Sequence, residues 1–240
     1  MMATGYESRV VMKGLSNPRG IAFDSVGNML IVQQGRGGVV LVKLNDNGGT
    51  NVCAASQKTL INDNTVSLLW GQFEVSHTYK DARDSDAESR SNDDKLNHGI
   101  DFSADGKTLF VSSLNGVFAY PYDVAAGTVG AKKQIITNTQ NGGFHLSRTL
   151  LAPKKAPGLL LVQRGSDGNL DKLTLDMASG HSQVRMFNIS TMMSATAPVD
   201  YVKGSDMLAW GLRNSVGVGE DATSGGIVSR QLSTLIINFV

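Results

Sequence analysis

A pattern of thirteen residues occurs twice in this chain. The first copy, at 20–32, is G-I-A-F-D-S-V-G-N-M-L-I-V, and the second, at 99–111, is G-I-D-F-S-A-D-G-K-T-L-F-V. The two copies share Gly, Ile, Phe, a turn Gly, Leu and Val at the same positions. Two short apolar runs around a glycine-containing turn are typical of a β-hairpin. The repeat therefore predicts a protein that is built from similar hairpin units.

Two looser copies follow. Residues 146–162 read L-S-R-T-L-L-A-P-K-K-A-P-G-L-L-L-V, and residues 210–221 read W-G-L-R-N-S-V-G-V-G-E-D. Repeats of roughly 40–50 residues made of short strands are typical of β-propeller blades. Long amphipathic helical patterns are absent from the sequence. We therefore expect an all-β protein, a β-propeller with about four blades; the alternative is a β-sandwich whose repeats are coincidental.

Charge and composition exclude several classes of protein. The net charge is +1, which gives no electrostatic case for binding to nucleic acid or to an anionic membrane. The sequence contains no run of 18 apolar residues, so we expect no transmembrane helix. Its N-terminal residues lack the apolar region of a signal peptide. The single cysteine, Cys53, excludes an internal disulfide framework and a cysteine-rich metal site, and we expect it to be buried.

One segment does not fit the repeat. Residues 64–95 include the charged run D-A-R-D-S-D-A-E-S-R-S-N-D-D-K, which has no large apolar side chain. Such a composition predicts an inserted disordered loop whose charges are solvated.

A basic residue or a histidine stands at the start of each expected inner strand. Aligned on the repeat, His98 takes the position of Arg19, and the later copies have Arg148 and Arg213 near this point. The inner strands of a propeller line its axis, so we expect these four side chains to converge on one funnel. Arginines suit carboxylates, and a histidine held neutral by neighbouring positive charge is a candidate general base. The structural alternative is that Arg19 pairs with an aspartate and His98 is a hydrogen-bonded turn residue.

Three further residues lie near these strand starts. His145 is close to Arg148 and has either a funnel or a surface position, and Arg164 follows the strong strand L-L-L-V. We expect Trp210 to pack between blades, with its indole N–H able to reach the funnel. His181 lies in a polar loop without a motif.

The four repeat copies resemble a known family. The segments N-P-R-G-I-A-F-D-S-V-G-N, L-N-H-G-I-D-F-S-A-D-G-K-T-L, L-L-L-V-Q-R-G-S and W-G-L-R-N-S-V-G-V-G-E-D are similar to those of fungal pyrroloquinoline-quinone (PQQ) dependent pyranose dehydrogenases. These enzymes are related to L-sorbosone dehydrogenases and to soluble quinoprotein glucose dehydrogenase. The resemblance covers most of 5–63 and 95–227, and its motifs occur in the family's order.

The resemblance implies a six-bladed propeller with PQQ on its axis, bound calcium, and oxidation of a sugar hydroxyl by hydride transfer to PQQ. By motif, His98 resembles the catalytic base, and Arg213 and Asn214 resemble the cofactor-contacting pair. Arg148 and Arg19 resemble further cofactor or substrate contacts, whereas the sequence identifies no calcium ligand. The family further implies an extracellular location and a haem protein or domain as electron acceptor.

The chain departs from the family after Gly226, where the family continues through two more blades. Residues 228–240 here are apolar and lack the repeat features. We therefore expect 1–227 to be a truncated, incomplete propeller followed by a non-family tail, and we expect this chain to be inactive alone. The sequon Asn188-Ile189-Ser190 is compatible with secretion.

Two other functions stay open at this point. A non-catalytic NHL-like propeller that binds proteins would need no histidine between arginines on its axis. A propeller lactonase would need several acidic or amide ligands around an axial metal, and the strand starts carry no such acidic set, so we rank it last.

Overall fold

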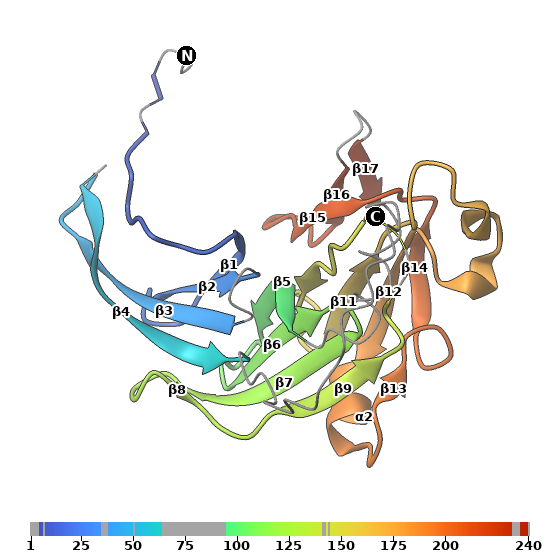
Figure 1. The fold of residues 1–240 in the computed structure, drawn as a ribbon, viewed down its shortest axis with the longest axis horizontal. Coiled ribbons are helices and arrows are strands. Elements are labelled where there is room, and N and C mark those ends of the chain that lie inside the picture. Colours follow the sequence, from blue (N-terminus) through green and yellow to red (C-terminus); the bar gives the residue numbers. More distant parts are fainter. Residues whose placement is uncertain are drawn as a thin grey trace, which may run out of the picture.

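The computed structural model describes residues 5–6, 8–34, 38–49, 51–63, 95–140, 143, 145–231 and 236–239. Strands dominate, and they form four sheets that follow one another in chain order, from blue to red in Figure 1. The predicted all-β class is therefore confirmed. No helix of the described residues is long and apolar enough to span a lipid bilayer.

The first sheet is an antiparallel meander that begins at the first repeat copy. The turn after its first strand is closed by Asp24, whose Oδ1 accepts from the amides of Val26 (3.1 Å) and Asn28 (2.8 Å). Gly27 has a φ of 82°, which favours glycine over any residue with a Cβ. The strands are β1 (Pro18–Phe23), β2 (Met29–Gln33), β3 (Gly38–Asp46) and β4 (Val52–Asn62).

The second sheet begins at the second repeat copy and has the same type of turn. Gly106 has a φ of 69°, and the Asp105 carboxylate accepts from the Lys107 amide at 3.1 Å. The two repeat copies thus form equivalent hairpins, as the sequence predicts. The strands are β5 (Leu96–Phe102), β6 (Thr108–Ser113), β7 (Gly116–Asp123), β8 (Thr128–Val129) and β9 (Lys133–Thr137), with β13 (Val199–Asp200) paired in parallel to β9.

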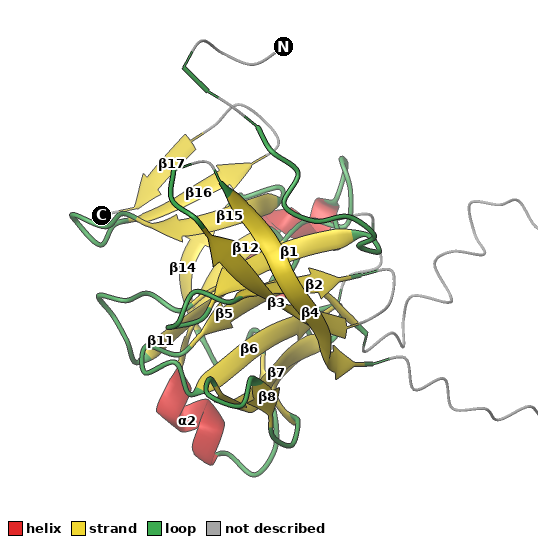
Figure 2. Cartoon of the chain, turned by 90° about the vertical axis from the view of Figure 1, so that its left-hand side faces the viewer, coloured by secondary structure: helices red, strands yellow, loops and turns green. Residues whose placement is uncertain are grey.

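The third and fourth sheets contain the two looser repeat copies. The third consists of β10 (Leu150–Leu151), β11 (Leu159–Arg164), β12 (Gln183–Asn188) and β14 (Asp206–Trp210). The fourth consists of β15 (Ser215–Glu220), β16 (Ile227–Gln231) and β17 (Ile236–Phe239). The short helix α2 (Ile189–Ser194) follows β12 and lies at the periphery (Figure 2). The 3-10 turns η1 (Lys172–Leu175) and η2 (Met177–Ser179) lie between β11 and β12.

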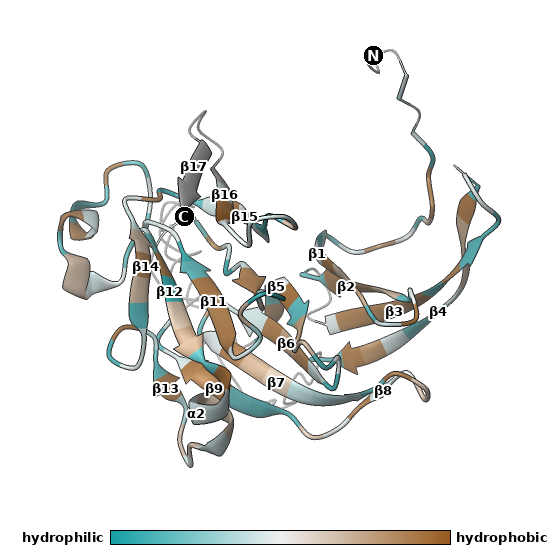
Figure 3. Ribbon diagram, turned by 180° about the vertical axis from the view of Figure 1, so that it is seen from behind, coloured by the Kyte–Doolittle hydropathy of each residue, from teal (hydrophilic) through white to brown (hydrophobic). Residues whose placement is uncertain are grey.

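Apolar side chains between adjacent sheets form the core. One cluster lies between the first and second sheets and includes Leu30, Leu41 and Leu109, all at most 1% exposed. Another lies between the second and third sheets and includes Phe110 and Phe187. Figure 3 shows the resulting hydrophobic colouring of β6 and β11. Burial of such side chains contributes about 1.5–3 kcal/mol each, so packing between sheets fixes their order around the centre.

One prediction from the sequence is wrong, and two others are not tested by the described residues. Cys53 is exposed, not buried, because its strand β4 is the outer strand of the first sheet. The expected disordered loop, except Lys95, falls outside the described residues. The boundary proposed at residue 227 stays a prediction, and β16 crosses it.

Candidate functional site

The predicted site residues lie at equivalent places in successive sheets. Arg19 and His98 lie in the innermost strands β1 and β5, and Arg148 lies two residues before the start of β10. Asn214 immediately precedes β15. β5 packs against β1 and β10, and β10 packs against β15, so these four strands are neighbours. The labelled strands β1, β5 and β15 surround the centre of Figure 1.

Glycines allow the innermost strands to approach one another. A Cβ on Gly20 would lie 2.1 Å from the carbonyl oxygen of His98, and a Cβ on Gly99 would lie 2.2 Å from that of Arg148. Only glycine permits a backbone approach this close. The glycine that follows Arg19 and His98 in the repeat therefore determines how near the site residues lie.

Side-chain hydroxyls join the same strands. Ser112 Oγ accepts from the Gly99 amide and donates to the Arg148 carbonyl oxygen, both at 2.7 Å. Thr149 Oγ1 lies 3.0 Å from the carbonyl oxygen of Ser215 and donates toward it. The backbone of the site is thus hydrogen-bonded from the second sheet through the third to the fourth.

His98 has the environment of a neutral imidazole. Its side chain is buried, and its Nδ1 atom has no hydrogen-bond partner among the described residues. Burial, followed by the positive charges of Arg19 and Arg148, lowers the pKa of His98 to about 4. The ring is therefore uncharged at neutral pH and able to accept a proton.

Two amide oxygens near His98 and Arg213 also lack partners. Asn97 donates through Nδ2 to the Leu146 carbonyl oxygen at 3.0 Å, but its Oδ1 is unsatisfied in the described structure. Asn214 is buried, and its Oδ1 is likewise unsatisfied there. Buried polar atoms are nearly always hydrogen-bonded, so these two oxygens, next in sequence to His98 and Arg213, are available as acceptors for a ligand.

Arg148 is part of the framework of the site. Its side chain is fully buried, and its guanidinium donates to the carbonyl oxygens of Thr139 (2.7 Å), His145 (2.9 Å) and Ser147 (2.7 Å). Burial and the charge of Arg164 lower the pKa of Arg148 to about 9, which leaves it protonated at neutral pH. Arg148 thus supplies positive charge and fixes the segment that leads into β10.

Arg213 lies at the wall of two cavities. One, of about 670 Å³, is lined by Arg213, His145, Asp167 and residues 168–171. His145 Nδ1 lies 2.8 Å from Ser166 Oγ, and burial together with the Arg213 charge lowers the pKa of His145. The second cavity shares Arg213 and residues 168–171 and extends to Trp210. Trp210 is 41% exposed, so the prediction that it packs between sheets is wrong.

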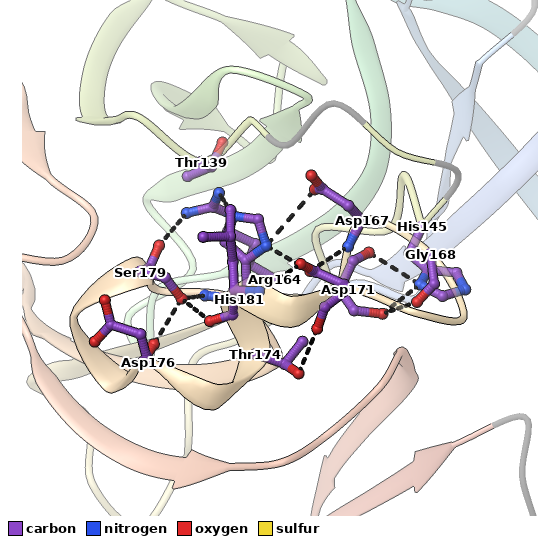
Figure 4. Close-up of polar contacts among 12 residues, drawn as sticks. Thr139, His145, Arg164, Asp167, Gly168, Asp171, Thr174, Asp176, Ser179 and His181 are labelled. Carbon is purple, nitrogen blue, oxygen red and sulfur yellow. Dashed lines mark hydrogen bonds and ion pairs between the residues drawn. The ribbon is translucent and has the colours of Figure 1, made fainter.

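A chain of hydrogen bonds holds the long connection between β11 and β12 (Figure 4). Arg164 Nη2 donates to His181 Nε2 at 2.6 Å, so His181 Nδ1 carries the proton that it donates to Asp171 at 2.6 Å. Asp171 also accepts from the Asp167 and Leu173 amides. Burial by itself raises the pKa of Asp171, but these hydrogen bonds outweigh burial and lower it.

Among the described residues, Asp167, Asp171 and His181 form a cluster whose possible ligand atoms lie within 4.8 Å of one another, close enough to hold a metal ion. Both ring nitrogens of His181 are already engaged, and the Arg164 guanidinium brings a positive charge against the ring. A cation would have to displace this arrangement, so the cluster acts as a structural clip. Sequence motifs did not reveal this clip of Arg164, His181 and Asp171, because His181 and Asp171 come from a loop without repeat character.

Comparisons with known proteins identify the family of this chain. The TrAA12-like family model matches residues 1–77 and 71–235. A PQQ-dependent sugar dehydrogenase from Hypocrea jecorina is 39% identical over 229 residues, which are 95% of this chain and 46% of that protein. A calcium structure of the family AA12 enzyme of Trichoderma reesei superimposes with a TM-score of 0.77 at 39% identity, covering 95% of this chain and 49% of that one. The holo form of the pyranose dehydrogenase PQQ domain of Coprinopsis cinerea superimposes with a TM-score of 0.72 at 29% identity. This match also covers 95% of this chain and 49% of that one.

The fold is similar to that of solved PQQ-dependent dehydrogenases. The chain belongs to the TrAA12-like family, and it is similar to fungal PQQ-dependent sugar and pyranose dehydrogenases. The resemblance predicted from the repeat motifs is confirmed. The chain spans about half the length of the solved relatives that it matches. Nothing in the comparisons supports the NHL-like alternative.

Proposed function

We propose that this chain contributes the catalytic base and part of the cofactor site of a PQQ-dependent sugar dehydrogenase. The observation that carries the proposal is His98, a buried imidazole with an unsatisfied Nδ1 between two arginine charges. It stands at the start of an innermost strand in a family of sugar dehydrogenases. A structural role would give His98 a hydrogen-bonded partner instead.

The residues at the strand starts fit PQQ. The cofactor is a planar quinone with three carboxylates, which need cationic donors and a polar enclosure. Arg213 and the exposed Arg19 would supply guanidinium donors, with Asn214 beside Arg213 as a buried polar neighbour. Arg148 would act through its charge, since its guanidinium is bound to backbone carbonyls. These assignments are proposals for each residue.

In the proposed mechanism, His98 accepts the proton of the sugar hydroxyl while the C–H hydrogen leaves as hydride. When bound, PQQ would supply the quinone chemistry that accepts this hydride. The low pKa of His98 keeps it unprotonated before the reaction, and cofactor carboxylates nearby would raise its basicity. The close contacts of Gly20 and Gly99 with neighbouring carbonyls hold the His98 backbone in register. These two backbone contacts orient the His98 side chain.

Calcium is a proposed companion of PQQ, since one solved relative is a calcium structure. The described Asp167–Asp171–His181 cluster does not fit such an ion, because both nitrogens of His181 are engaged. Calcium prefers oxygen ligands, which include backbone carbonyls. We therefore assign no side chain to calcium and route no step through it.

Further parts of the proposal concern context. We propose that each of the four sheets corresponds to one blade of a propeller, that a haem protein or domain receives the electrons, and that the protein works outside the cell. The location is supported by Asn188 of the sequon, whose side chain is exposed at the start of α2. The sugar substrate follows from the names of the relatives.

The test is a PQQ titration of the chain with calcium present, followed by tryptophan fluorescence. We expect saturable binding that weakens at least about tenfold in Arg213→Ala, because a carboxylate loses a charged hydrogen bond. Arg9→Ala is the matched control, since Arg9 is exposed and bonds to Asn51 away from the site. Equal affinity in the wild type and Arg213→Ala would refute the assignment of Arg213.

A second arm tests the base. Where the PQQ-loaded wild type oxidises sugar with an artificial electron acceptor, His98→Ala should abolish this activity while PQQ affinity persists. Oxidation that continues undiminished in this variant would remove His98 from the mechanism.

A further inference from the structure

The connection between the second and third strands is unusually long in one sheet. It spans 165–182 in the third sheet, whereas the equivalent connections are 34–37 in the first sheet and 114–115 in the second. Long ordered loops in compact domains commonly carry binding residues. This loop stands beside the site, because the Ser166 amide donates to the Arg213 carbonyl oxygen at 2.9 Å.

The loop is held rigidly. The clip of Arg164, His181 and Asp171 fastens its middle, and Arg213 Nη2 donates to Asn169 Oδ1. The indole N–H of Trp210 donates to the Thr174 carbonyl oxygen at 3.0 Å. These contacts come from three separate segments, so the loop presents a preorganised surface.

That surface is apolar where it faces a cavity of about 670 Å³. The cavity is lined by Leu170 and Leu175, which are 95% and 81% exposed, and by Trp210. Asn169, Lys172 and Arg213 add amide and cationic groups to its wall. Solvent-exposed leucines cost free energy, and their concentration at one cavity indicates a ligand that covers them.

A pyranose ring matches this wall. Its two faces carry C–H groups that pack on indole and aliphatic side chains, and its rim carries hydroxyls that bond to amide and cationic groups. Residues 168–171 and Arg213 also line the neighbouring cavity with His145, so the two cavities share one wall.

We propose that the cavity between the 165–182 loop and Trp210 is a saccharide subsite, which binds a pyranose ring adjoining the ring to be oxidised. The substrate class is then an oligosaccharide. This inference rests on the proposed function, since it requires that a sugar is oxidised next to Arg213.

The test measures binding of maltotriose, cellotriose and glucose to the full chain by calorimetry, without PQQ. At least one trisaccharide should bind more tightly than glucose. Leu170→Ser and Leu175→Ser should weaken that binding about tenfold each, since each variant removes an apolar contact. Both side chains are exposed, so neither substitution threatens the fold. Leu173→Ser is the matched control, because Leu173 is exposed on the same loop but does not line the cavity.

PQQ binding, measured on the same samples by quinone absorbance, separates this inference from the proposed function. PQQ binding without binding of either trisaccharide overturns the subsite and leaves the proposed function standing. Equal weakening by Leu173→Ser and Leu170→Ser also overturns it. Trisaccharide binding lost in the cavity variants supports the subsite, and a simultaneous absence of PQQ binding would count against the proposed function instead.

Discussion

Ser112 Oγ lies 2.7 Å from the carbonyl oxygen of Arg148, in the next sheet along the chain, and donates to it. Ser112 Oγ in turn accepts a hydrogen bond from the Gly99 amide at 2.7 Å. This buried hydroxyl thus connects the residue after His98 to Arg148. The position of His98, the proposed base, relative to Arg148 is therefore fixed by a serine to which we assign no chemical role.

The first prediction concerns this serine. Ser112→Ala leaves the Gly99 amide and the Arg148 carbonyl oxygen without their shared partner in a fully buried place. We expect a loss of about 1–3 kcal/mol in the free energy of unfolding, measured with denaturant. Ser194→Ala, an exposed serine whose hydroxyl caps a local turn, should change stability by less than about 0.5 kcal/mol. Equal effects of the two substitutions would contradict the proposed link.

The second prediction concerns close approach. Gly20→Ala places a methyl group 2.1 Å from the carbonyl oxygen of His98, which cannot move without shifting β5. We expect destabilisation of about 1–3 kcal/mol. Gly158→Ala is the control, because a Cβ there meets nothing within 4 Å. If thermal unfolding shows Gly20→Ala as stable as Gly158→Ala, the inner strands are not packed as described.

The third prediction is a dependence of stability on pH. His98 titrates near pH 4 when folded and near 6.5 when unfolded, so the unfolded state binds the extra proton between these values. Stability should therefore fall as the pH drops through this window, by roughly 3 kcal/mol from His98, and level off below it. Because the lowered pKa of His145 acts in the same direction, the measured quantity is the difference between the wild type and His98→Gln. Parallel stability profiles of the two proteins would argue against a depressed pKa.

The fourth prediction concerns the loop clip. His181→Gln breaks the path from Arg164 to Asp171 and leaves a buried guanidinium with fewer partners. We expect faster amide hydrogen exchange in 165–182 than in the wild type, because opening this loop becomes easier. Asp176→Asn on the same loop keeps a side-chain cap and should exchange like the wild type. Unchanged exchange in His181→Gln would show that other contacts hold the loop.

The sequence was most informative where it repeats. The shared Gly, Phe and turn Gly predicted two equivalent hairpins, and Gly27 and Gly106 both have the positive φ that such turns favour. The same alignment placed Arg19 and His98 at corresponding strand starts. Local patterns of this type survive in the fold because turn chemistry and strand periodicity act over a few residues.

The rest depended on contacts between distant residues. Ser112 bonds to a carbonyl 36 positions away, and nothing in its own neighbourhood indicates this. Arg148 was predicted to face a ligand, yet backbone carbonyls surround its guanidinium. Trp210 was expected inside and lies at a cavity, because the 165–182 loop provides the acceptor for its indole N–H. Such outcomes follow from tertiary packing, which a local pattern does not specify.

The most direct test of the central claim is an NMR titration of His98 with and without PQQ and calcium. The chain has four histidines, and His98→Gln identifies the signal. The account predicts a pKa of about 4 in the free protein and a higher value in the complex, since cofactor carboxylates next to the ring stabilise its charged form. A PQQ complex in which the His98 signal and its pKa stay unchanged would contradict the account, because the cofactor would then bind away from the proposed base.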